Sequence, residues 1–172
     1  MRQTLLVPLF TSAVLWLGGC DKDQPASATP GKAHGYTISA ATYRDDAKVS
    51  ELAKGKCKFE IELTETVTTT LQEKGVGGKN GEGHTVTLVI AHVHGAEEDW
   101  DGEIRVMVEG RLELPDESFH DFVAHGNSTA HVGRGKAGVC DGLEDIAAEI
   151  SEDIVEWLKE PRHEAELGDH PT

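Results

Sequence analysis

The stretch that decides the fold is VCDGLEDIAAEISEDIVEWL, residues 139–158. Its apolar residues recur every three or four positions, the spacing that places side chains on one face of an α-helix. Asp141 and Glu144 have the spacing of a capping box and predict the start of this helix, and Pro161 predicts its end. The helix therefore needs an apolar partner surface for the stripe formed by Val139, Leu143, Ile146, Ala147, Ile150, Ile154, Trp157 and Leu158.

A second stripe occupies residues 57–74, CKFEIELTETVTTTLQEK. Phe59, Ile61 and Leu63 alternate as in a β-strand, but a four-residue spacing also runs on to Leu71. The 18-residue length of the segment and the glycine that follows it favour a helix.

Four further segments indicate strands: residues 36–43, 84–94, 103–114 and 118–131. Residues 103–114, EIRVMVEGRLEL, alternate most regularly, whereas Phe119 and Phe122 are out of register with each other and suggest a bulge. The order is β-α-β-β-β-α. Two helices with one apolar stripe each predict an α+β fold: a two-layer sandwich with both helices on one face of a mostly antiparallel sheet.

The N-terminal residues have the three parts of a secretory signal. Arg2 precedes an apolar run over residues 5–17, and the segment ends Leu17-Gly18-Gly19-Cys20. This ending resembles the lipobox of bacterial lipoproteins. The resemblance implies that residues 1–19 form a signal peptide and that Cys20 becomes a lipidated N-terminus carrying fatty-acyl groups such as palmitate. Several acyl chains anchor a protein stably to a membrane.

Composition divides the rest of the chain. Residues 20–35 are rich in Ala, Pro, Ser and Gly and predict a flexible tether, residues 36–160 form the globular domain, and residues 161–172 form a polar tail. The formal net charge is −15. A surface this negative repels phosphate backbones, so nucleic acid is not expected as a ligand. The expected location is the bacterial cell envelope, with the domain facing the periplasm. The inner and the outer membrane both remain open.

Cys57 and Cys140 remain as a pair, each at the start of an expected helix. In an exported protein two cysteines commonly form a disulfide, and parallel helices packed side by side would bring these two together. The alternative is a thiol-active redox enzyme that uses low-pKa cysteines, but the chain has no C-x-x-C motif. A structural disulfide is favoured.

Histidines offer a second alternative. His92 and His94 lie two residues apart and could share a metal, with His125 or His131 joining them from another strand. No carboxylate or His-x-x-x-His pair completes the set, so a polar sheet face is the preferred interpretation. The sequence also lacks a nucleophile elbow and any family-type Cys-His pair, which argues against an enzyme. No cofactor is expected.

The helix ending at Gly75, the alternating strands at 84–94 and 103–114 and the final helix at 140–160 resemble the layout of small envelope lipoproteins. These are the group around the curli-secretion pore subunit and the N-terminal domain of the Tol–Pal translocation protein. The resemblance covers most of residues 36–160. It implies a non-catalytic protein-binding or assembly module with a protein partner in the envelope.

Overall fold

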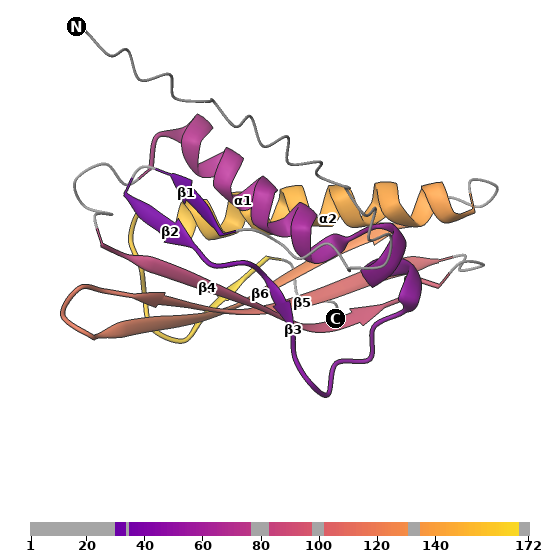
Figure 1. The fold of residues 1–172 in the computed structure, drawn as a ribbon, viewed down its shortest axis with the longest axis horizontal. Coiled ribbons are helices and arrows are strands. Elements are labelled where there is room, and N and C mark those ends of the chain that lie inside the picture. The colour runs from indigo at the N-terminus through magenta and orange to yellow at the C-terminus, as the bar shows by residue number, and fades with distance from the viewer. Residues whose placement is uncertain (1–29, 34, 77–82, 98–101, 131–134, 169–172) are drawn as a thin grey trace, which may run out of the picture.

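The computed structural model describes residues 30–33, 35–76, 83–97, 102–130 and 135–168. The described residues form two layers, a twisted mixed sheet and a pair of helices that lie on one face of it (Figure 1). This arrangement confirms the predicted α+β sandwich.

The sheet is built around three long strands, β4(Thr85–His94), β5(Glu103–Glu113) and β6(Phe119–Thr129), which pair antiparallel in sequence order. Short strands complete it on both sides. β1(Gly31–Ala33) pairs antiparallel with β2(Tyr36–Ile38), while β2 and β3(Thr42–Tyr43) both pair parallel with β4, and β7(Ala165–Leu167) pairs parallel with β6. The sheet is thus mostly antiparallel, with parallel pairs at its margins.

The helices are α1(Phe59–Lys74) and α2(Lys136–Trp157), and a short π-helical turn, η1(Leu52–Lys56), precedes α1. A disulfide joins Cys57, before α1, to Cys140 in α2. Further along, the Lys74 ammonium lies 3.5 Å from a carboxylate oxygen of Glu152. The start of α1 is thus joined to the start of α2, and the end of α1 contacts a later residue of α2. The two helices therefore run parallel, as expected if Cys57 and Cys140 pair.

Local geometry corrects three expectations. Helix α2 begins at Lys136 after Gly135, so Asp141 lies inside the helix and the capping-box prediction is wrong. The pairing of β5 with β6 is regular throughout, and the register shift lies in β4 between Ile90 and His92, so the bulge was predicted in the wrong strand.

The expected strand at 36–43 is the third correction, because it is interrupted between β2 and β3. The Ala41 N–H leaves the sheet there and donates to the buried Thr64 hydroxyl at 2.9 Å. The sheet also extends beyond residues 36–160 at both ends, since β1 lies before this range and β7 after it.

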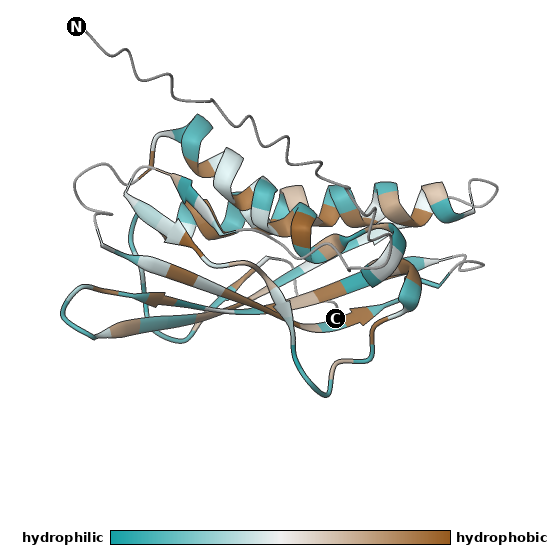
Figure 2. Ribbon diagram, viewed as in Figure 1, coloured by the Kyte–Doolittle hydropathy of each residue, from teal (hydrophilic) through white to brown (hydrophobic). Residues whose placement is uncertain are grey.

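The core lies between the helices and one face of the sheet, where apolar residues alternate with polar ones along each strand (Figure 2). The Phe122 ring packs on Trp157 of α2 with centroids 4.7 Å apart. Nearby, α2 approaches β6 closely at Gly126, where an added Cβ would lie 2.8 Å from Ile146. Burial of this single continuous core is the main stabilising contribution to the fold.

Candidate binding surface on the open face of the sheet

The face of β4, β5 and β6 turned away from the helices is called the open face here. Both helices lie on the opposite side, so no helix in the described part of the chain covers it (Figure 1). The side chains that alternate outward come from three adjacent strands and mix apolar, basic, acidic and imidazole groups. They are Thr87, Val89, His92, His94, Arg105, Met107, Glu109, Arg111, Asp121, Val123, His125 and Asn127.

One half of the open face is hollowed around Val89 and Val123, in a depression of about 440 Å³. Its rim carries an ion pair between cross-strand neighbours: Arg111 Nε donates to Asp121 Oδ1 at 2.7 Å. This hydrogen bond raises the pKa of Arg111, so the guanidinium stays fully charged. Arg44 extends from the β3 side to Glu109 at 2.6 Å, which places a second arginine at the same rim.

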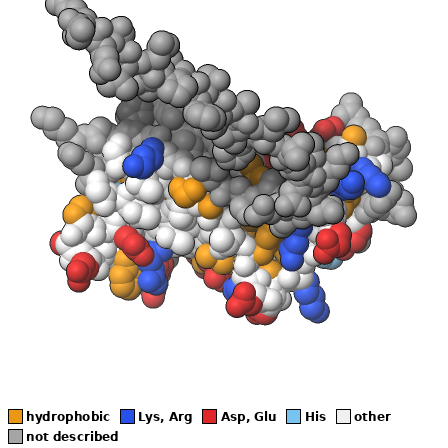
Figure 3. All heavy atoms as spheres, viewed as in Figure 1, with side chains coloured by type: hydrophobic (Ala, Val, Ile, Leu, Met, Phe, Trp, Pro, Cys, Tyr) orange, Lys and Arg blue, Asp and Glu red, His pale blue; other side chains and the backbone are white. Residues whose placement is uncertain are grey.

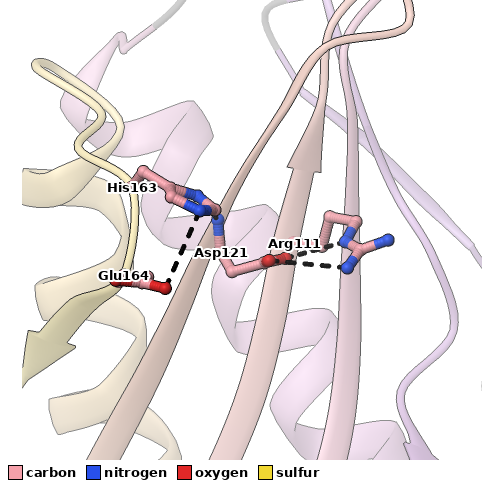
Figure 4. A network of polar contacts seen from close by, with 4 residues as sticks. All are labelled: Arg111, Asp121, His163 and Glu164. Carbon is pink, nitrogen blue, oxygen red and sulfur yellow. Dashed lines mark hydrogen bonds and ion pairs between the residues drawn. The ribbon is translucent and has the colours of Figure 1, made fainter.

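An aromatic group borders this half of the open face. The Arg111 guanidinium lies 4.2 Å from the centroid of the Phe119 ring. Among the described residues Phe119 is the exposed large hydrophobic side chain, with 44% of its surface accessible. His163 packs edge-on to the same ring at 5.8 Å and accepts a long hydrogen bond, 3.5 Å, from the Asp121 N–H. Figure 4 shows the resulting network of Arg111, Asp121, His163 and Glu164. An exposed ring held by a cation is suited to contact with another molecule.

The other half of the open face contains the histidines. The register shift after Ile90 moves Val93 to the core side and turns His92 and His94 outward, where their rings stack with centroids 6.3 Å apart. Cross-strand pairing places Met107 beside His92 and His125 beside Met107. These residues line a second depression, of about 390 Å³, next to the first.

The geometry gives the metal alternative no support. Among the described residues, no group of three or more His, Cys, Asp or Glu side chains is placed to hold a metal ion. His131, which the sequence offered as a candidate third metal ligand, lies outside the described residues. His92 and His94 are both exposed on the open face.

The cysteine pair lies in the helix layer, away from the open face. Cys57 and Cys140 are bonded to each other across 83 positions of sequence, with Cα atoms 5.1 Å apart. Their place at the joint of two helices fits a structural cross-link. Cys20 and the rest of residues 1–29 lie outside the described residues. No helix in the described ranges has the length and apolarity needed to cross a membrane.

Sequence reasoning found part of this surface and missed the rest. The alternation of residues 103–113 already separates Arg105, Met107 and Glu109 from the core side. Nothing local in the sequence signals that Asp121 faces Arg111, because that contact depends on the register of β5 against β6. The contribution of His163 was also missed, since residues 161–172 were expected to be a polar tail.

Comparison with known proteins gives no family. No protein-family model matches the chain, and no curated protein matches it either. Among solved structures, the chain is similar to a candidate lipoprotein from Caulobacter crescentus CB15, at 16% identity and a TM-score of 0.43, over 70% of this chain and 88% of that one. It is also similar to a minor lipoprotein from Acinetobacter baumannii, at 11% identity and a TM-score of 0.41, over 80% and 98% of the two chains.

A third similar structure is a PelC variant from Paraburkholderia phytofirmans that forms a dodecamer. It shares 12% identity and a TM-score of 0.38, over 73% of this chain and 93% of that one. Likenesses at this level leave the family and the function of the chain to be argued from its own residues.

Proposed function

We propose that this chain is an envelope lipoprotein, anchored in a membrane by a lipid on Cys20, whose domain binds a protein partner through its open face. It acts as a non-catalytic module. The lipobox-like ending at residues 17–20 supports the anchor, and the signal-like segment before it supports export to the periplasm.

The observation that carries the binding role is the open face itself. A half-buried apolar floor, including Val89, Met107 and Val123, is flanked by the paired arginine Arg111 and the exposed ring of Phe119. Methionine, arginine and aromatic residues are enriched in protein interfaces, where an apolar centre is bordered by a polar rim.

Charge also favours a protein partner over a membrane surface or nucleic acid for this face. Acidic and basic side chains are interspersed along the side of the molecule below the helices (Figure 3), rather than gathered by sign. Such alternation matches a partner with its own alternating charges and sets the register of docking. A polyanion would meet the carboxylates of Glu109 and Asp121 beside each arginine.

Site-specific photo-crosslinking in native envelopes tests the proposal. A photoreactive residue in place of Val123, on the open face, is expected to capture one discrete partner. The matched control replaces Glu65, which is exposed on α1, and is expected to capture none. Arg111→Glu, in the background of the Val123 probe, should reduce capture several-fold because it places two negative charges together at the rim. Equal capture from both positions, or capture that Arg111→Glu leaves unchanged, would contradict the assignment.

A further inference from the structure

A further depression, apart from the two on the open face, lies at the end of the sandwich where both helices stop. It is called the end pocket here. It is an open depression of about 600 Å³ between the last residues of α1 and α2 and the facing ends of β4, β5 and β6. That volume suits a small organic molecule, and it lies on the core side of the sheet, separate from the open face. Much of its lining is apolar, from Tyr36, Val76, Leu112, Leu114, Leu158 and Pro161.

Two imidazoles face this apolar lining. His120 is on the core-facing register of β6, opposite Leu112, and His84 precedes β4 on the register of buried Val86. The Nδ1 atom of each ring is buried and has no hydrogen-bond partner. A buried polar nitrogen without a partner costs free energy, and both of these rings belong to residues that line the pocket.

The charged side chains that line the end pocket are basic. Lys74 and Lys159 line it beside the two histidines, and none of its described lining residues is Asp or Glu, although the chain as a whole is strongly acidic. Each lysine also meets a glutamate on the surface, Glu152 and Glu156 respectively. Exposed pairs of this kind are weak and exchange readily for a better-placed anion.

From these observations we infer that the end pocket binds a small amphipathic carboxylate. The apolar body would lie against Leu112, Leu114 and Leu158, and the carboxylate would accept hydrogen bonds from the imidazoles of His84 and His120, with the lysines at the mouth. This inference does not depend on the proposed role of the open face, because the two sites share no lining residue.

Calorimetric titration of the intact chain with naphthoate tests the site, with naphthylmethanol as the neutral probe of the same shape. Naphthoate is expected to bind at one site and naphthylmethanol at least about tenfold more weakly, since the alcohol carries no negative charge to pair with the basic lining. The variant His84→Gln/His120→Gln should weaken naphthoate binding by about tenfold or more. The control His92→Gln/His94→Gln, with both changes on the open face, should leave it unchanged.

A measurement on the unaltered chain covers the case in which the double variant fails to fold. Imidazole nitrogen resonances of His84 and His120 should shift when naphthoate is added, while those of His92 and His94 stay in place. The inference is overturned if naphthoate does not bind, if naphthylmethanol binds as tightly, or if the resonances of His84 and His120 do not move.

Discussion

The Phe122 ring fills the space that a side chain at position 110 would need. The two residues are cross-strand partners, and a Cβ built on Gly110 would lie 2.0 Å from Phe122 Cζ. The missing side chain lets the ring lie across β5 while it packs on Trp157, which links the sheet to the last turn of α2. One glycine in a strand thus serves the packing of the helix layer.

Gly110→Ala should therefore destabilise the protein by about 1–3 kcal/mol, because the added methyl group must push the Phe122 ring off Trp157. Urea unfolding followed by tryptophan fluorescence measures the change. Gly55→Ala is the matched control: an added Cβ there meets nothing within 4 Å, so stability should hold or rise slightly. A Gly110→Ala protein as stable as the wild type would show that the ring can move without cost.

At the scale of elements, the disulfide fixes how the two helices lie. It joins residues 83 positions apart, at the starts of two parallel helices that together cover the sheet. Such a cross-link removes conformational freedom from the unfolded chain, and the effect grows with the length of the loop that it closes.

Replacing both cysteines, Cys57→Ser/Cys140→Ser, should lower the free energy of unfolding by as much as about 4–5 kcal/mol on the chain-entropy account. Denaturant unfolding measures this, and reduction of the wild type should reproduce it. Thiol labelling of the unfolded, unreduced chain should find neither cysteine reactive. Two reactive thiols would contradict the disulfide and revive the redox alternative.

The elements also show what the sequence could and could not predict. Both helices and the three long strands have apolar periods extended enough to identify, and their stripes imply the layers. β1 and β7 have three residues each, too few for any period, and they form because a sheet edge offers them partners. The sequence favoured a polar sheet face for His92 and His94, but it could not show that they share this face with Val89, since that depends on the register shift after Ile90.

The candidate sites divide in the same way. Alternation along residues 103–113 separates an outer from an inner face, so half of the open face follows from the sequence. The end pocket does not, because His84 and His120 lie 36 positions apart in the numbering and meet only when β4, β5 and β6 are paired. Long-range register, rather than local preference, assembles both sites.

For the molecule as a whole, the proposed anchor predicts where the chain is found in the cell. Cys20→Ser should move it from the sedimented membranes to the soluble periplasmic fraction, because the acyl chains that hold it would be lost. Fractionation and immunoblotting measure the shift. Cys57→Ser/Cys140→Ser, which alters two other cysteines, should remain with the membranes. A Cys20→Ser chain that still sediments with the membranes would count against lipid anchoring.

Strand β1 has a consequence for how far such a molecule could reach. It is hydrogen-bonded into the sheet from Gly31 onward, although residues 20–35 were expected to be free tether. If Cys20 carries the lipid, only residues 21–30 remain as the tether between the membrane and the sheet. At 3.3–3.6 Å per residue they extend to about 35 Å at most. The first residue of β1 would then stay within that distance of the bilayer, so the domain would remain next to the membrane.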